Sequence, residues 1–262
     1  MPHAAITLSP WHLIIDEARP GYANMARDQA LLDLADRNGT GVLRLYRWSP
    51  HCLSLGRNEP ALKRYHREQI EALSLDVVRR PTGGRAVWHG RELTYAVTAP
   101  IERFGSLAQA YHTIHQMLAR AVHSLGTAAW LAPSPSRPMG LDAGACFASP
   151  AGGEVMVADQ KLIGSAQLKQ GAALLQHGSL LIDDDQSTVQ SVTRGDPPRS
   201  LDAPLARLLN RQVSFEEVAR AVQAAARTWP GPWNEWEGET ELSEMARAHE
   251  ATYQSEAWTW RR

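Results

Sequence analysis

The most informative stretch of this chain is Arg79-Arg80-Pro81-Thr82-Gly83-Gly84-Arg85-Ala86-Val87-Trp88-His89. Its first two residues belong to the segment 76–80, which is predicted to be a β-strand, and Pro81 ends that strand. The adjacent glycines allow positive φ angles and let a ligand approach the main chain closely. Amide groups exposed in such a turn form a concave site for anions. The stretch therefore indicates either a tight strand connection with solvated arginines or a ligand-binding turn.

The charges and glycine spacing of this stretch narrow its chemistry. Gly83-Gly84 has neither the glycine spacing of a dinucleotide fingerprint nor the lysine of a P-loop. Arg79, Arg80 and Arg85 add positive charge, although the alternation of a strand places Arg79 and Arg80 on opposite faces. The stretch is therefore neither a dinucleotide-binding fingerprint nor a P-loop.

The segments around this turn predict the fold class. Apolar and alternating runs predict strands over 42–48, 52–56, 76–80, 93–99, 154–158 and 174–182, and helical periodicity predicts helices over 24–37, 61–73 and 106–125. Strands and helices interleave without regular βαβ alternation, which favours an α+β domain with a mixed or antiparallel sheet flanked by helices. From about residue 201 the chain is mainly helical. We expect one domain over 1–262, with this part as a subdomain or as a cover on the sheet.

Composition limits the partners and the compartment. The 262 residues carry 27 basic and 28 acidic side chains, for a net charge of −1. This balance argues against a nucleic-acid binder, which needs a basic face. No apolar run approaches the ~20 residues that span a bilayer, and residues 1–5 lack the basic-then-apolar pattern of a signal peptide. With only two cysteines, we expect a cytoplasmic protein without disulfides or membrane contact.

Two histidines and two cysteines are the remaining candidates for chemistry. His89 and His177 each suit a general base, a ligand contact or a buried structural role. No histidine pair has metal-ligand spacing, so no metal is expected. Cys52 lies in an apolar strand and suits a buried hydrophobe. Cys146 lies in a glycine-rich loop, and a hairpin can return Lys161 beside it, where an ammonium group would favour the thiolate.

Several long motifs resemble the lipoate/biotin protein ligase and octanoyltransferase superfamily. They are the stretch from Arg79 to His89 with Glu92-Leu93-Thr94-Tyr95, Lys161-Leu162-Ile163-Gly164-Ser165-Ala166-Gln167, Leu174-Leu175-Gln176-His177-Gly178-Ser179, the helix containing Asn24-Met25-Ala26, and the end with Tyr253, Trp258 and Arg261-Arg262. The resemblance spans nearly the whole chain. It implies the α+β fold of a biotin/lipoate ligase catalytic domain.

Within the superfamily, three features are similar to the octanoyltransferase branch. Cys146-Phe147 stands ahead of Pro150, where that branch places its acyl-accepting cysteine. Glu92-Leu93-Thr94-Tyr95 stands where ligases carry an asparagine-rich version, and the length leaves little room for a ligase's additional domain. One departure concerns the acyl pocket: the transferases have a Ser-Trp-Tyr-Glu-like run where this chain has Ala151-Gly152-Gly153-Glu154.

The resemblance implies a cofactor-independent acyl transfer with octanoyl-acyl carrier protein as donor and a lipoyl domain, or small lipoyl carrier protein, as acceptor. Cys146 and Lys161 would be catalytic, and Arg79, Arg80, Arg85, Arg91 and the basic C-terminus would steer acidic proteins. Backbone amides around Gly83-Gly84 or Gly164-Ser165 would stabilise the oxyanion. The substrate-binding candidates are Arg79, Arg80, Thr82, Gly83, Gly84, Arg85, His89, Gly164, Ser165, Ala166, His177 and Gly178.

Three alternatives stay open. An ATP-dependent lipoate ligase would use ATP and Mg²⁺, with Lys161 and the glycine turn contacting the adenylate and Cys146 incidental. A second alternative moves acyl groups between lipoyl proteins. A third is a non-catalytic acyl- or lipoyl-binding protein, which would never form a covalent adduct at Cys146.

Overall fold

A six-stranded mixed sheet lies at the centre of the fold. The computed structural model describes residues 9–132, 153–157, 159–196 and 202–261. In the central sheet the strands run in the order β10-β11-β6-β2-β1-β12, and β1 is parallel to β2 and β12 while the other pairs are antiparallel. Their bounds are β1 (Trp11–Ile15), β2 (Gly41–Tyr46), β6 (Glu92–Pro100), β10 (Ile163–Gln170), β11 (Ala173–Leu181) and β12 (Trp233–Asn234).

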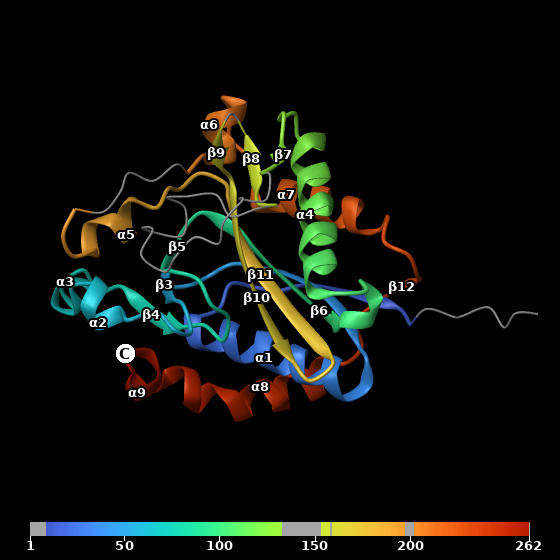
Figure 1. The fold of residues 1–262 in the computed structure, drawn as a ribbon, viewed down its shortest axis with the longest axis horizontal. Coiled ribbons are helices and arrows are strands. Elements are labelled where there is room, and N and C mark those ends of the chain that lie inside the picture. Colours follow the sequence, from blue (N-terminus) through green and yellow to red (C-terminus); the bar gives the residue numbers. More distant parts are fainter. Residues whose placement is uncertain (1–8, 133–152, 158, 197–201, 262) are drawn as a thin grey trace, which may run out of the picture.

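Helices cover both faces of this sheet (Figure 1). One face carries α4 (Leu107–Ser124) and α7 (Phe215–Ala226), and the other carries α1 (Gly21–Asn38) and α8 (Glu239–Gln254). The period of two in β6 explains the arrangement: Tyr95 and Val97 pack in the core under α4, while Ala96 packs in the core under α1. Because both faces are buried, the central strands are apolar on both sides.

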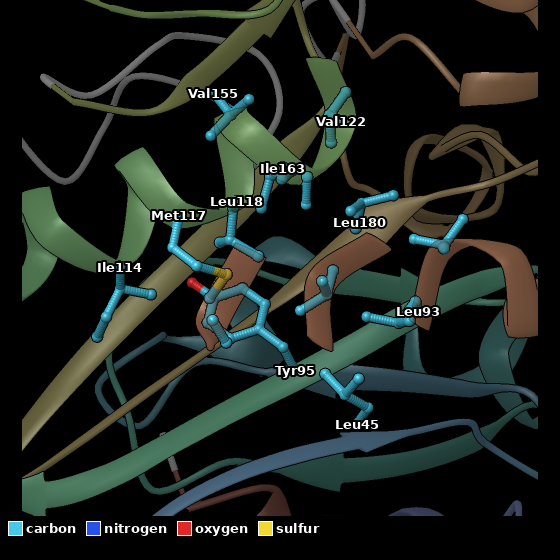
Figure 2. Close-up of a cluster of buried hydrophobic side chains, with 14 of the residues drawn as sticks. Leu45, Leu93, Tyr95, Ile114, Met117, Leu118, Val122, Val155, Ile163 and Leu180 are labelled. Carbon is cyan, nitrogen blue, oxygen red and sulfur yellow. The ribbon is translucent and has the colours of Figure 1, made fainter. Parts of the chain in front are cut away.

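The core under α4 is built from apolar side chains of this helix and of the strands that it covers. Figure 2 shows it, with the labelled residues Leu45, Leu93, Tyr95, Ile114, Met117, Leu118, Val122, Val155, Ile163 and Leu180. The phenol of Tyr95 lies among these side chains and is the polar group of the cluster. This core supports the strands that carry the motif after Lys161.

Two small sheets flank the central one. One has the order β4-β3-β5, and the other has the order β7-β8-β9. The remaining elements are β3 (Cys52–Leu55), α2 (Ala61–Arg64), α3 (Arg67–Ala72), β4 (Asp76–Arg79), β5 (Val87–His89), η1 (Ile101–Arg103), β7 (Trp130–Leu131), β8 (Val155–Val157), β9 (Gln160–Lys161), α5 (Ser187–Val192), α6 (Leu205–Leu209) and α9 (Glu256–Thr259). Among the residues described, no helix combines the length and apolarity needed to cross a membrane.

The α+β class and the mixed sheet flanked by helices are confirmed, with two local differences. The single helix expected over 61–73 is two helices, because Tyr65 is extended and pairs with Thr193. Helix α1 begins at Gly21, three residues before the expected start at Asn24. Asn24 is tolerated inside the helix because its side-chain amide donates to the carbonyl groups of Arg19 and Arg47.

The part after residue 201 shares both cores of the sheet. Val218 and Val222 of α7 pack in the core under α4, and Leu242 of α8 packs in the core with α1. β12 extends the central sheet beside β1. In the described residues this part therefore lies against the sheet as a helical cover.

Candidate active site

A pocket opens between the central sheet and the small sheet of β3, β4 and β5. Strands β10 and β11 form one wall, and the opposite wall comes from α1, β3 and β5. Its lining residues are Met25, Tyr46, Trp48, Ser54, Arg80, Val87, His89, Thr94, Gly164, Ser165, Ala166, His177, Gly178 and Ser179. Apolar side chains and ring faces dominate this lining, and a few polar groups are held at fixed positions.

Two glycines bring the strands of the pocket wall close together. Gly178 in β11 pairs with Ser165 in β10. A Cβ atom at position 178 would lie 2.3 Å from the carbonyl oxygen of Gly164 and 2.6 Å from Oγ of Ser165. Any larger residue would therefore push β10 away from the pocket.

The glycine turn after β4 is folded onto its own arginine. The guanidinium of Arg80 donates to the carbonyl groups of Gly83 and Arg85, and Gly84 has a φ of +88°. A Cβ atom at Gly83 would meet nothing within 4 Å. The main chain at Gly83 is thus open to an approaching group, as a ligand-binding turn requires.

Arg79 and Arg80 are buried, so the expectation that they steer acidic proteins from the surface is wrong. Arg79 is 0% exposed and donates to the carbonyl oxygens of Gly56 and Glu59 and, near the C-terminus, of Thr259. Arg80 is 5% exposed and donates to the carbonyl and hydroxyl groups of Ser54. The two side chains leave the strand in different directions: Arg79 binds α9 to the sheet, and Arg80 reaches the pocket wall.

The other basic residues proposed for steering differ in exposure. Arg85 is half-buried, and Arg91 is exposed and forms an ion pair with Asp183. Arg261 stacks its guanidinium over Trp258 and donates to the carbonyl oxygen of Arg57. These three remain at the surface or close to it.

His177 is held by a buried carboxylate. Its Nδ1 lies 2.8 Å from Oδ2 of Asp28, and its Nε2 lies 2.6 Å from the hydroxyl of Thr82. Burial alone would raise the pKa of Asp28, but hydrogen bonding from His177 and the charge of Arg44 lower it. Since an ionised carboxylate only accepts, Nδ1 of His177 carries the proton of this hydrogen bond. Thr82 thus positions the pocket-lining histidine without lining the pocket itself.

His89 is a neutral pocket residue. Its ring stacks on Trp48 with the centroids 4.1 Å apart, and its Nε2 lies 2.8 Å from the hydroxyl of Ser54. Burial lowers the pKa of His89. The side chain therefore contributes a packed, uncharged surface to the pocket.

Lys161 lies at the start of the motif that forms the pocket wall. It is 1% exposed, and its Nζ lies 2.5 Å from Oε1 of Glu154. Cys146, its expected partner, lies outside the described residues. Cys52 is fully buried, and burial together with the nearby charge of Asp76 raises its pKa, as suits an inert thiol.

A chain of hydrogen bonds runs behind the pocket wall from strand β11 to helix α4. Gln176 donates to the phenol oxygen of Tyr95 at 3.0 Å, and this oxygen lies 2.6 Å from Oγ of Ser165. The same Ser165 oxygen lies 2.8 Å from Nε2 of His115. Burial and the charge of Lys161 lower the pKa of His115 to about 3, so its ring is neutral. Ser165 thus links Tyr95 of β6 to His115 of α4.

Comparison with known proteins identifies the family. A model described as the lipoyl protein ligase A/B catalytic domain matches residues 20–227. The chain belongs to this family. Its curated relatives include octanoyltransferase LipM of Kyrpidia tusciae, which is 34% identical over 97% of this chain and 100% of that protein. Octanoyltransferase LipM of Symbiobacterium thermophilum is 33% identical over 96% of this chain and 98% of that protein.

Solved structures share the fold of this lipoyl protein ligase A/B catalytic domain. Lipoate-protein ligase A bound with ATP superposes with a TM-score of 0.79 at 20% identity, over 96% of this chain and 99% of that chain. A bi-partite lipoate protein ligase from Thermoplasma acidophilum superposes with a TM-score of 0.71 at 19% identity, over 96% of each chain. At these identities the likeness concerns the fold alone.

The pocket of this ligase-family domain brings together seven of the predicted site residues. They are Arg80, His89, Gly164, Ser165, Ala166, His177 and Gly178. Thr82 and the glycine turn adjoin the pocket through His177 and Arg80, while Arg79 belongs to the contact with α9. Lys161 precedes the pocket-wall strand β10 along the chain and is buried beside Glu154.

Sequence reasoning missed seven pocket residues and the groups behind the wall. The pocket residues are Met25, Tyr46, Trp48, Ser54, Val87, Thr94 and Ser179, and the others are Asp28, His115 and Glu154. Asp28 could have been found from the sequence, because it lies among the apolar residues of a predicted helix, and a buried carboxylate needs a polar partner. Within the described ranges, no group of three or more histidine, cysteine, aspartate or glutamate side chains is arranged to hold a metal ion.

Proposed function

We propose that this chain moves an octanoyl group from acyl carrier protein, through a thioester on Cys146, to a lysine of a lipoyl domain. The observation that supports it most is the set of curated octanoyltransferases at 30–38% identity. Several of them align over 96–98% of this chain. The chain is accordingly an octanoyltransferase of protein lipoylation, and the donor, the acceptor and the catalytic residues are the finer part of the proposal.

The pocket suits an acyl chain. About seven buried carbons at ~0.8 kcal/mol each contribute roughly 5–6 kcal/mol before ordering costs. Met25, Val87 and Ala166 offer apolar surface in the lining. The open main chain at Gly83 and the wall at Gly164 supply amide groups near the pocket for the thioester oxygen.

The reaction proceeds in two balanced steps. The thiolate of Cys146 attacks the donor's thioester carbonyl, the new C–S bond forms, and the carrier's thiolate leaves and takes a proton from Lys161. The acceptor's lysine amine then attacks the acyl-enzyme, the C–N bond forms, and Cys146 leaves as thiolate while the amine proton returns to Lys161. A thioester becomes an amide, which is downhill, so neither ATP nor a metal is required. We place this reaction in the cytoplasm.

The decisive experiment mixes purified protein with octanoyl-acyl carrier protein and an apo lipoyl domain, with and without ATP. Mass spectrometry reads the octanoyl mass on each protein. We expect modification without ATP, an acyl adduct on the enzyme, and loss of both in Cys146→Ala. Cys52→Ala is the matched control, because this thiol is buried away from the pocket and should be dispensable.

Two outcomes would overturn the proposal. A strict ATP requirement would make the chain a ligase, and full activity of Cys146→Ala would remove the covalent intermediate. For Lys161→Ala we expect a large rate loss in a folded protein. Wild-type rates in that variant would remove Lys161 from the reaction.

A further inference from the structure

The side chains of Glu154 and Lys161 meet across a short hairpin. Strands β8 and β9 are antiparallel, and Met156 pairs with Lys161. Glu154 stands directly before β8, and its Oε1 lies 2.5 Å from Nζ of Lys161. The two side chains are 4% and 2% exposed. This is a fully desolvated ion pair rather than a surface contact.

Such a pair controls the charge of the lysine. Burial of an isolated ammonium group costs several kcal/mol, and a carboxylate in hydrogen-bond contact offsets that cost. Removing only the carboxylate would leave a buried charge that is relieved by giving up the proton. Glu154 therefore favours the ammonium form of Lys161.

Among the described residues, the other titratable groups packed near the amine are His115, Tyr95 and Asp202. From α4, His115 is neutral, because burial and the charge of Lys161 lower its pKa to about 3. From β6, Tyr95 is a neutral phenol, because burial and, more weakly, the charge of Glu154 raise its pKa. Asp202 pairs with Lys161 through the main chain, and its carboxylate accepts from the amide of Gln186 at 3.3 Å.

The pair is connected to the pocket. Ser165, four residues after Lys161, lines the pocket and lies 2.8 Å from Nε2 of His115. His115 in turn feels the charge of Lys161. A displaced or discharged Lys161 would thus alter the electrostatics directly behind the pocket wall.

We propose that Glu154 is a positioning residue for octanoyl transfer, holding Nζ of Lys161 in place and keeping it an ammonium group until the reaction takes its proton. The proposal rests on the proposed function, which assigns Lys161 to the transfer. When Lys161 protonates the leaving thiolate of the carrier, Glu154 is left beside a neutral amine. The negative charge of Glu154 then favours return of a proton to Lys161 from the acceptor's attacking amine.

The test is the pH dependence of octanoyl transfer in Glu154→Gln, which keeps the shape of the side chain and removes its charge. We expect kcat/KM at pH 7.5 to fall at least tenfold. The alkaline limb of the profile should move to lower pH by at least one unit, because Lys161 loses its proton more readily. Glu154→Asp keeps the charge and should return the limb to within about 0.3 units of wild type.

Asp202→Asn is the matched control, since it removes a buried carboxylate whose hydrogen bond goes to the main chain. Its alkaline limb should coincide with wild type. A folded Glu154→Gln protein with the wild-type limb overturns the proposal, as does an equal shift in Asp202→Asn.

If Glu154→Gln does not fold, the test compares the residual transfer rate of Lys161→Met with that of the double variant Glu154→Gln/Lys161→Met. The double variant contains neither buried charge. Equal residual activity of the two supports action of Glu154 through Lys161. A further loss of more than threefold in the double variant overturns it. Wild-type rates in Lys161→Met would instead contradict the proposed role of Lys161 in the transfer, which distinguishes the two failures.

Discussion

The Nδ1 atom of His177 lies 2.8 Å from Oδ2 of Asp28, and this contact joins helix α1 to the pocket wall on β11. The same carboxylate accepts from Nη1 of Arg44 at 2.7 Å and from the hydroxyl of Tyr46 at 2.8 Å. Asp28 is 0% exposed. One buried carboxylate thus fixes the orientation of a pocket histidine and balances the charge of a buried arginine.

Asp28→Asn should destabilise the protein by about 3–5 kcal/mol, because it leaves part of the charge of Arg44 uncompensated in the core. Denaturant unfolding followed by circular dichroism measures the change. Glu241→Gln is the control, because it breaks the surface ion pair between Glu241 and Arg37, whose side chains are each 54% exposed. It should lower the free energy of unfolding by less than about 1 kcal/mol. Equal effects of the two substitutions would contradict a structural role for the buried network.

Acid should destabilise the protein through His115. The pKa of this residue is lowered from 6.5 to about 3 by burial and by Lys161. Between these values the unfolded chain binds a proton that the folded chain does not, so stability falls as the pH decreases from 6.5 toward 3. The total effect of this group is on the order of 4 kcal/mol.

The measurement is the free energy of unfolding at several pH values for wild type and His115→Gln. We expect a flatter curve for the variant between pH 6.5 and 3. His123→Gln removes an exposed histidine of the same helix and should keep the wild-type slope. A variant curve parallel to wild type would show that His115 titrates normally in the folded protein.

Gly178→Ala should lower both stability and octanoyl transfer. The added methyl group would lie 2.3 Å from the carbonyl oxygen of Gly164, so β10 and β11 must separate at the pocket wall. Overpacking of this kind costs about 1–3 kcal/mol. Gly83→Ala should change stability by less than about 0.5 kcal/mol, because a Cβ there meets nothing within 4 Å. Thermal unfolding of both variants checks the contrast.

Val87→Ala should relax the chain-length preference of the pocket. Removing two methyl groups from the lining makes room for a longer chain, and we expect the ratio of decanoyl to octanoyl transfer to rise about tenfold. Val97→Ala creates a similar cavity in the core away from the pocket. That control should lose stability by about 1–3 kcal/mol without changing the ratio. Competition between the decanoyl and octanoyl donors, followed by mass spectrometry of the acceptor, measures the ratio of the two transfers.

Local patterns account for the elements that the sequence predicted well. The sequence predicted strands over 93–99, from alternation, and over 174–182, and the structure shows them as Glu92–Pro100 and Ala173–Leu181. The helix expected over 106–125 is Leu107–Ser124, with Ser106 accepting from the amide of Gln109 as its N-cap. These features depend on neighbours within a few residues, which a single sequence contains.

Burial of charge was not predictable in the same way. Arg79 and Arg80 stand beside a glycine turn and suggested a surface for acidic partners, but both donate to carbonyl groups far away in the chain. Whether an arginine faces solvent or the interior depends on which carbonyl groups the fold leaves unpaired around it. No local pattern contains that information.

The sequence alone determined the α+β class, the positions of half of the described strands and the two glycine motifs, because periodicity and backbone freedom are local properties. Only the tertiary structure decided which polar groups meet: Asp28 with His177, 149 residues apart, and Ser165 with His115, 50 residues apart. It also placed Glu154 on Lys161. The reason is that a buried polar group must be matched by a partner in space, and the packing of sheet and helices selects that partner.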